Sequence, residues 1–255
     1  MITRYRVKLG IIQMDSLDDD LAILDVEHSA PDFQIDENRT ANADGYDYGE
    51  EYFKKTTVTV RFELHIYDIE RRNEICQKIN TWARAGGVLT VNDRKGQQLM
   101  NVRCAKFASV DSVRDWTKPL TIVFETTGCP FWQSEEESAL DLAGTTPKGT
   151  LKLDGNTGKA LVSVTATAQA AVTKFKISVG DTVIELKDLS VATGQTIVID
   201  YVRNRYLMIR ANGKSVLMQP NSSDVLSATC GASSGVQINA NGRVNATVKA
   251  RGLWL

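Results

Sequence analysis

Four acidic residues crowd one short segment near the start of the chain and could hold a cation. Asp15, Asp18, Asp19 and Asp20 all carry carboxylates, and Ca²⁺ prefers oxygen ligands of this kind. An EF-hand loop, however, needs Gly at its sixth position and Glu at its twelfth, and that order is missing here. The segment is therefore predicted to be a solvated acidic loop, and no metal site is assigned to it.

The cysteines lack the spacing that ligand or redox chemistry needs. None lies in a C-x-x-C or C-x-x-H pattern, which argues against a zinc site, and their wide scatter argues against a disulfide framework. They are predicted to be buried free thiols, and the alternative of a redox pair has no motif to support it. The four are Cys76, Cys104, Cys129 and Cys230.

The sequence does not predict a catalytic site either. The two histidines are His28 and His65, and His65 is predicted to be a structural residue within a strand. No serine is predicted to lie in a nucleophile elbow, and no H-E-x-x-H or P-loop is present. We therefore predict no enzyme and assign no catalytic, cofactor-binding or metal-ligating residues. Two carboxylates from distant strands could still meet, as in a glycosidase, and that alternative stays open.

The composition is that of a soluble globular protein without a charge bias. Hydrophobic residues make up 42% of the 255 residues, and the formal net charge is −1, so nothing global steers the chain toward nucleic acid or an anionic membrane. No apolar run approaches a membrane span, and no secretory signal is visible in residues 1–20. We expect no cofactor, no membrane association, no specific nucleic-acid binding and synthesis in a bacterial-type cytoplasm.

One helix is clearly marked at about residues 69–85. Asp68 is a favourable N-cap, and Gly86–Gly87 suit the left-handed conformation that ends a helix. Apolar residues recur on one face, so the helix is predicted to lie on a sheet with Trp82 in the core, and Arg71 or Arg72 is expected on the polar surface. The apolar face comprises Ile69, Ile75, Ile79 and Trp82, with Cys76 beside it.

Strands are predicted on both sides of this helix. Residues 2–9 alternate apolar and polar side chains, residues 88–91 and 99–107 read as a hairpin around the turn at 92–96, and residues 120–127 form another strand. Together these elements predict an N-terminal domain of residues 1–132, a β-sandwich or barrel-like domain with one packed helix.

A long polar segment, residues 31–55, interrupts this domain and is predicted to be a loop. Loops of such length are usually functional or tied to a neighbour. Four aromatic residues could anchor it either on its own domain or on another subunit. They are Tyr46, Tyr48, Tyr52 and Phe53.

The composition changes after Trp132. Residues 133–146 are acidic, then small and turn-forming, and are predicted to be a linker or crossover. Residues 147–255 carry short strands at regular spacing with Gly-Asp and Asn-Gly turns, which is typical of a β-sandwich. Trp254 is predicted to be packed there. The fold class is therefore mainly β, in two domains.

Four features follow one another within residues 1–132. They are the alternating strand ITRYRVKL, a Gly-bearing turn before a strand (NADGYDYGEEY leading into TTVTVRFEL), a helix ending in W-x-x-x-G-G (82–87), and a strand ending in FETTGCPFW (124–132). In order and spacing they resemble the distal tail protein family of siphophages, whose tails are long and non-contractile. The acidic segment at residues 15–20 departs from the usual family pattern.

The resemblance implies a structural adaptor with a galectin-like C-terminal β-sandwich. Family members form a homohexameric ring that joins the end of the tail tube to the tail tip or host-binding apparatus. The implied partners are other copies of the chain, the tail tube protein, and tail tip or receptor-binding proteins. The implied location is the virion, after assembly in the cytoplasm of the host bacterium.

A carbohydrate-binding module of a tail or cell-surface adhesin is the alternative function. It would need an exposed aromatic platform on the C-terminal sandwich, for which solvent-exposed Tyr201 and Tyr206 are the candidates. Both lie in a strand or turn, where packing is favoured over exposure. The residue set of galectin-type sugar recognition is not found in the sequence. A shared fold would not by itself make the domain a sugar binder.

Overall fold

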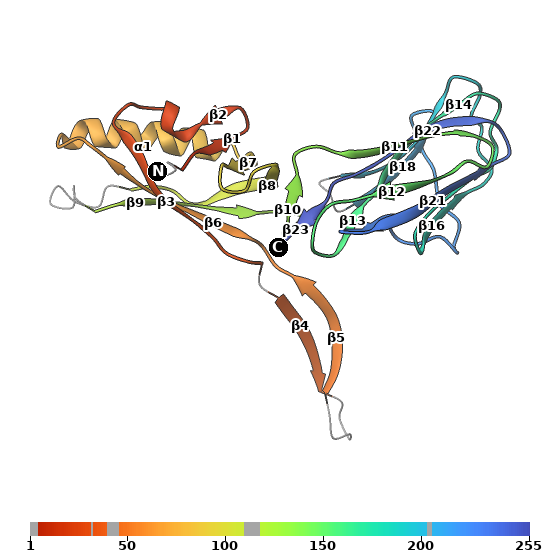
Figure 1. The fold of residues 1–255 in the computed structure, drawn as a ribbon, viewed down its shortest axis with the longest axis horizontal. Helices are drawn as coiled ribbons and strands as arrows, with labels where there is room; N and C mark the ends of the chain where they lie inside the picture. The colour runs from red at the N-terminus through yellow and green to blue at the C-terminus, as the bar shows by residue number, and fades with distance from the viewer. Residues whose placement is uncertain (1–4, 32, 40–45, 110–117, 203–205) are drawn as a thin grey trace. The chain divides into compact units, whose positions relative to one another are not determined.

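A computed structural model of the chain describes residues 5–31, 33–39, 46–109, 118–202 and 206–255 (Figure 1). Within these residues the protein is mainly β with one α-helix, so the predicted fold class is confirmed. The chain divides into two compact units, Met1–Trp132 and Gln133–Leu255.

The first unit is built on one antiparallel sheet whose strands run in the order β2-β1-β7-β8-β9-β6-β3. The predicted alternation is seen in β6, where Val58, Val60 and Phe62 are fully buried. Residues 2–4 of the predicted first strand lie outside the described residues. The strands are β1 (Val7–Leu9), β2 (Ile12–Gln13), β3 (Leu21–His28), β6 (Thr57–Leu64), β7 (Gly87–Val91), β8 (Gln97–Lys106) and β9 (Leu120–Thr126), with a 3₁₀ turn at Met14–Ser16.

Helix α1 (Ile69–Arg84) lies on one face of this sheet, as predicted (Figure 1). The Asp68 side chain caps it by accepting a hydrogen bond from the Glu70 N–H at 2.9 Å. The helix ends at Arg84 and Gly86 follows its cap. At Gly86 φ is +60° and a Cβ would lie 2.7 Å from the Val102 carbonyl oxygen, so only glycine fits. The buried Trp82 ring meets Phe124 of β9 edge to face, with the ring centroids 5.8 Å apart.

The two arginines at the start of α1 have different surroundings. Arg71 is on the polar surface, as predicted, but Arg72 is only 2% exposed. Arg72 lies three and four positions before Ile75 and Cys76, which places it on the apolar face of the helix. Its Nε is buried with no hydrogen-bond partner among the described residues.

The segment predicted as a long loop is mostly a β-hairpin. β4 (Phe33–Arg39) and β5 (Tyr46–Phe53) pair antiparallel from Phe33 opposite Phe53 to Arg39 opposite Tyr46, with a register shift after Ile35. Among the described strands they form a two-stranded sheet of their own. We call this hairpin the β-arm. Its polar composition favoured a loop prediction, but backbone pairing does not need apolar side chains.

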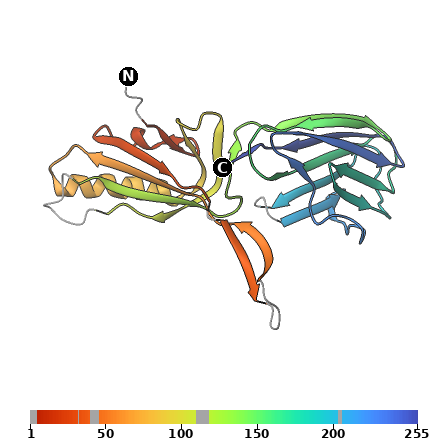
Figure 2. The same cartoon turned by 60° about the horizontal axis from the view of Figure 1, so that its bottom comes forward.

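The second unit is a β-sandwich, as predicted, and Figure 2 gives a second view of it. Its larger sheet has the order β11-β22-β14-β17-β18-β19, its smaller sheet β12-β21-β15-β16, and β13 pairs with β20. A galectin-like character stays a prediction. The strands are β11 (Ser138–Gly144), β12 (Lys148–Lys152), β13 (Lys159–Leu161), β14 (Ser163–Ala168), β15 (Phe175–Val179), β16 (Thr182–Leu186), β17 (Thr196–Val202), β18 (Tyr206–Ala211), β19 (Lys214–Ser215), β20 (Ser227–Thr229), β21 (Ser233–Ala240) and β22 (Val244–Ala250).

Residues 133–146 differ from the predicted linker or crossover. β10 (Trp132–Ser134) pairs with the last strand, β23 (Leu253–Trp254). β11 pairs with β22 from Ser138 opposite Ala250 to Gly144 opposite Val244. As the end strand of its sheet, β11 buries only Leu142 fully, which is why its sequence is polar enough to read as a linker.

Candidate assembly surfaces

β3 ends the sheet of the first unit and offers one candidate surface. It is an eight-residue strand, it follows β6 at the end of the strand order, and its Leu24 side chain is 42% exposed. A strand at the end of a sheet can pair with a strand from another chain. Two features lower the tendency of β3 to pair with arbitrary strands. They are the register shift between Ile23 and Asp25 and the exposed charge of Glu27, since bulges and charges oppose such pairing.

The opposite end of the sheet carries a second, unlike surface. The turn between β1 and β2 has Gly10 at φ +60° and presents Ile11, which is 91% exposed, and Ile12, which is 47% exposed. The Trp82 indole N–H donates to the Ile12 carbonyl oxygen at 3.2 Å, so the helix supports the turn from beneath. An apolar tip held on a rigid base is suited to burial against another protein.

The root of the β-arm is a third candidate surface and is aromatic. The Phe33 and Phe53 rings, both exposed, lie 5.1 Å apart between centroids, and Phe53 lies 5.1 Å from Phe131. The predicted anchoring on the chain's own domain is thus seen for Phe53. The side chains of Tyr46, Tyr48 and Tyr52 lie outside the described part of the structure.

A buried carboxylate fixes the strand that leaves the arm. Glu125 at the end of β9 is only 4% exposed and pairs through one oxygen with Lys55 and through the other with Arg103 of β8, whose Nε lies at 2.7 Å. The hydrogen bond from Lys55 lowers the pKa of Glu125, burial opposes this by raising it, and Arg103 lowers it further. The net direction is downward, so Glu125 is held ionised between two cations.

Four side chains gather at the other end of the arm root. The His28 Nε2 lies 2.8 Å from Asp93 Oδ2, and the His28 ring meets the buried Trp132 edge to face at 5.2 Å. The Arg94 guanidinium lies 5.4 Å from the Trp132 ring centroid, within the range of a cation–π contact. His28 Nδ1 is buried without a hydrogen-bond partner among the described residues. His28 is therefore structural here, oriented by a carboxylate and an indole.

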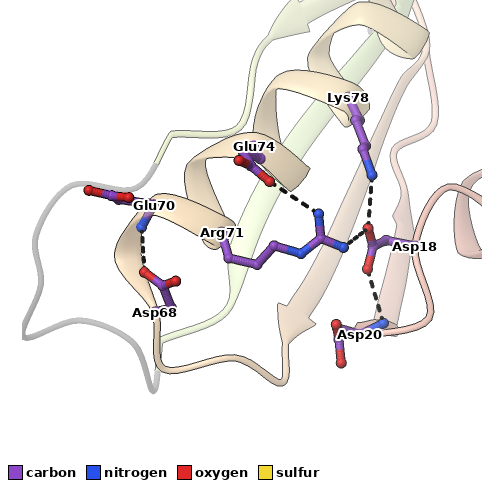
Figure 3. Close-up of polar contacts among 7 residues, drawn as sticks. All are labelled: Asp18, Asp20, Asp68, Glu70, Arg71, Glu74 and Lys78. Carbon is purple, nitrogen blue, oxygen red and sulfur yellow. Dashed lines mark hydrogen bonds and ion pairs between the residues drawn. The ribbon is translucent and has the colours of Figure 1, made fainter.

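The acidic segment is tied to the helix rather than fully solvated (Figure 3). The Asp18 carboxylate accepts from Arg71 Nη2 at 2.7 Å and from Lys78 Nζ at 3.1 Å, while Arg71 also bonds Glu74 at 3.2 Å. Burial alone would raise the pKa of Asp18, but the bond from Lys78 and the charge of Arg71 lower it overall. The solvated-loop prediction is therefore wrong for Asp18, which joins the loop to α1, and Asp19 alone of the four is exposed.

The aromatic platform predicted on the second unit is not assembled. Tyr201 is buried, and its hydroxyl accepts from the Leu226 N–H at 2.6 Å and donates to the Leu226 carbonyl at 3.2 Å. Burial raises its pKa to about 12. Tyr206 is 62% exposed. Packing, which the sequence favoured for both tyrosines, is therefore confirmed for Tyr201 and wrong for Tyr206, so one of the two rings that a platform would need is missing from the surface.

One stretch of the second unit matches the sequence pattern of a nucleophile elbow but does not have the structure of one. Residues 231–235 read G-A-S-S-G, which matches G-x-S-x-G. The elbow places its serine on a sharp turn between a strand and a helix. Here Ser233 is the first residue of strand β21, and Ser234 is buried, with its hydroxyl accepting from the Thr229 N–H at 3.2 Å. The serine at the elbow position therefore begins a strand.

The remaining reactive residues are dispersed. The four cysteines form no disulfide with one another, and only Cys76 is fully buried, whereas Cys104, Cys129 and Cys230 are partly exposed. His65 lies exposed just after β6 rather than within a strand. In the described ranges no group of three or more His, Cys, Asp or Glu side chains is placed to hold a metal ion. Nor does any helix in those ranges have the length and apolar character to cross a membrane.

The comparisons with known proteins concern the fold. No known sequence family and no curated protein sequence matches the chain. Among solved structures it is similar to phage SPP1 Dit, described as a paradigm of the hub adsorption apparatus in phages that infect Gram-positive bacteria. The identity is 12%, the match covers 99% of this chain and 100% of that one, and the TM-score is 0.73. The distal tail resemblance of the sequence is thereby confirmed at the level of the fold.

A weaker similarity is found to a chain of the phage P2 baseplate in its activated conformation with Ca. It has 10% identity, covers 99% of this chain and 98% of that one, and has a TM-score of 0.49. A similarity of this size carries no argument about the present chain.

Proposed function

We propose that the chain is a structural phage tail protein, a ring-forming adaptor at the distal end of the tail tube that connects it to the tail tip or host-binding apparatus. The likeness of fold to SPP1 Dit, which extends over essentially the whole of both chains, supports this proposal. The proposed partners are other copies of the chain, the tail tube protein, and tail tip or receptor-binding proteins. The proposed location is the virion, following assembly in the host cytoplasm.

The observation that carries the ring proposal is the pair of unlike ends of the first sheet. One end presents the strand β3, and the other presents the Ile11–Ile12 turn beside the short β2. Contact between two different surfaces of identical subunits is head-to-tail, and it closes into a ring when the rotation per subunit allows. Such a contact would also cover an edge that otherwise invites aggregation. The number six comes from the distal tail resemblance.

The proposed adaptor performs no catalysis and needs no cofactor. The serine at the elbow position begins a strand, and His28 is held between Asp93 and Trp132. A sugar-binding role for the second unit would rest on Tyr206 without a second exposed tyrosine, since Tyr201 is buried.

Native mass spectrometry of the full chain tests the proposal. We expect a species of six times 28.1 kDa at tens of micromolar protein. Leu24→Lys should remove that species, because it places a charge on the exposed face of β3 where an apolar contact is needed. The matched control is Leu217→Lys, at a residue of the second unit that is 89% exposed, which should leave the hexamer intact.

Two outcomes would count against the ring. The first is a wild-type chain that stays monomeric in this assay and also fails to form rings when mixed with tail tubes lacking their distal protein. The second is equal loss of the hexamer in both lysine variants, which would point to an unspecific effect of charge.

A further inference from the structure

The two strands of the β-arm join the sheet of the first unit at one place. β3 ends at His28 and β6 begins at Thr57, and the residues next to these ends are bonded to each other. The Ser29 N–H donates to the Thr57 carbonyl oxygen at 2.9 Å, and the Thr57 N–H donates to Ser29 Oγ at 2.9 Å. The entry and exit of the arm are therefore a single bonded unit.

A segment from elsewhere in the sequence, Glu125–Trp132, holds both sides of this root. On the exit side Glu125 pairs with Lys55, and Thr56, which is fully buried, exchanges hydrogen bonds with Thr126 at 3.0 and 3.1 Å. The Thr56 hydroxyl also donates to the Pro130 carbonyl oxygen. We call Glu125–Trp132 the socket.

The aromatic end of the socket contacts both strands of the root. The Phe131 ring meets Phe53 at the end of β5, and the Trp132 ring meets His28 at the end of β3. Trp132 is also held from the β7–β8 turn, since Arg94 lies over its ring and Asp93 holds His28. On the exit side Phe53, Lys55 and Thr56 therefore contact the socket directly. On the entry side His28 does so, and Ser29 is bonded to Thr57, which lies opposite Glu125.

The socket has a second connection, which is covalent. Its last residue, Trp132, is the last residue of the first unit, and the next residue, Gln133, begins the second unit. The segment that contacts the arm root, residues 125–132, is therefore also the segment that leads into the second unit.

We propose that the socket couples the β-arm to the chain segment that enters the second unit, so that binding or displacement of the arm changes the environment of Trp132, and a change at Trp132 changes the stability of the arm. The coupling acts in both directions, as any equilibrium coupling between two sites must. It arises from contacts within one copy of the chain and does not depend on the ring.

Fluorine NMR of the full chain labelled with 5-fluorotryptophan tests the first direction. Lys55→Met removes one cation from Glu125 at a side chain that is 55% exposed, so the unit should stay folded. We expect the Trp132 signal, assigned with Trp132→Phe, to shift or broaden while the signal of Trp82 stays in place. The matched control is Lys187→Met, which removes a lysine from the carboxylate of Glu185 in the second unit and should leave the Trp132 signal unchanged.

Hydrogen exchange tests the reverse direction. Arg94→Met removes the cation that lies over the Trp132 ring, and we expect exchange of the β5 amides to become about fivefold faster or more, at the lower end of usual coupling strengths. A Trp132 signal that is identical in the wild type and in Lys55→Met would overturn the proposal. So would unchanged β5 exchange in Arg94→Met, or a Trp132 response to Lys187→Met equal to that of Lys55→Met.

Discussion

In the first unit an eight-residue strand, β3, ends the sheet order, whereas in the second unit the end strand β16 is bound by a loop that follows later in the chain. The Gln219 N–H donates to the Glu185 carbonyl at 2.9 Å, and the Glu185 N–H donates to Ser222 Oγ at 3.0 Å. Ser223 likewise accepts from the Val183 N–H at 3.0 Å. The larger sheet of the second unit ends on one side in the two-residue strand β19 and on the other in the seven-residue strand β11.

The difference separates two uses of the same β architecture. Covered and very short end strands oppose pairing of a sheet with other chains, and the second unit protects the β16 and β19 ends of its two sheets in these ways. A long end strand, an apolar turn and a two-stranded arm leave hydrogen-bonding and apolar groups for a partner. A two-stranded hairpin is only marginally stable by itself in water, which makes the β-arm the part of the first unit that gains most from a neighbour.

The largest effect on stability should come from a fragment of the second unit that begins after β11 rather than before it. A fragment of residues 133–255 should fold, whereas residues 147–255 lack β11 and expose one edge of β22 along its whole length. Loss of the buried Leu142 alone costs about 1.5–3 kcal/mol, before the β11–β22 hydrogen bonds are counted. Circular dichroism melting compares the two fragments. Equal melting temperatures would mean that β11 is dispensable and that the boundary belongs after it.

Trp82→Ala should be the most damaging single substitution in the first unit. Truncation of a large buried aromatic residue costs about 3–5 kcal/mol, and Trp82 also loses its contacts with Phe124 and the Ile12 carbonyl. Denaturant unfolding, followed by far-ultraviolet circular dichroism, should show the loss in one transition only. Phe107→Ala, at an exposed ring of the same unit, is the control with little expected effect. An unchanged first unit in Trp82→Ala would make the helix face a contact surface.

Gly252→Ala should destabilise the second unit through a backbone clash. A Cβ at this position would lie 2.3 Å from the Asp154 carbonyl oxygen, and forced overpacking costs about 1–3 kcal/mol. Gly235→Ala provides the matched control, because a Cβ there meets nothing within 4 Å. The readout is the melting temperature of the 133–255 fragment. If the two alanine variants have equal melting temperatures, the backbone segments at Gly252 and Asp154 are able to move apart.

Glu125→Gln should have a smaller effect that depends on pH. The pKa of Glu125 is lowered in the folded state from its ordinary value of 4.5, so its contribution is present above about pH 4.5 and is lost as the pH falls through the folded-state pKa. We expect about 1 kcal/mol at neutral pH, because both partner cations are more than half exposed and screened by solvent.

The measurement is the difference in free energy of unfolding between the wild type and Glu125→Gln as a function of pH. That difference should shrink as the pH falls below about 4.5 and vanish once Glu125 is protonated. Carboxylates common to both proteins, such as Asp18, cancel in this difference. If the difference stays constant from neutral to acid pH, the ion pairs of Glu125 do not contribute to the stability of the arm root.

The last prediction is that the chain shows no hydrolytic activity. Incubation of the chain with peptidoglycan or bacterial surface polysaccharides should release no reducing ends, since no nucleophile or acid–base set is assigned. Reproducible release that a single Asp or Glu substitution abolishes would make the chain an enzyme. Binding without turnover, weakened by Tyr206→Ala, would favour a sugar-binding second unit and leave the ring proposal for the first unit in place.

The parts of the fold that followed from sequence are those with strong local signals. The cap at Asp68, the apolar face of α1 and the glycine at residue 86 specify the helix through neighbouring residues alone. The β15–β16 and β18–β19 turns likewise carry Gly-Asp and Asn-Gly pairs. Buried and turn positions of this kind are decided within a few residues, so they can be read without knowledge of the tertiary fold.

The parts that were missed depend on distant partners. The β-arm and β11 are strands because of backbone pairing, and their polar side chains hide the alternation that does exist, as in Phe33, Ile35 and the spaced tyrosines of β5. Asp18 looked solvated because Lys78, its partner, lies sixty residues away. The socket contacts join residues about seventy positions apart, such as Thr56 and Thr126, and no local pattern announces them.

The first and last strands of the second unit have a further consequence. The Ser134 N–H donates to the Gly252 carbonyl oxygen at 3.0 Å, the Gly252 N–H donates to Ser134 Oγ at 2.9 Å, and Arg251 donates to the Ser134 carbonyl at 2.8 Å. The two ends of the sandwich are thus fastened together, as in a domain that tolerates insertion or circular permutation. Because the first and last strands of the sandwich lie next to each other, we expect that another compact domain with similarly placed ends could replace it without a change in the sequence of the first unit.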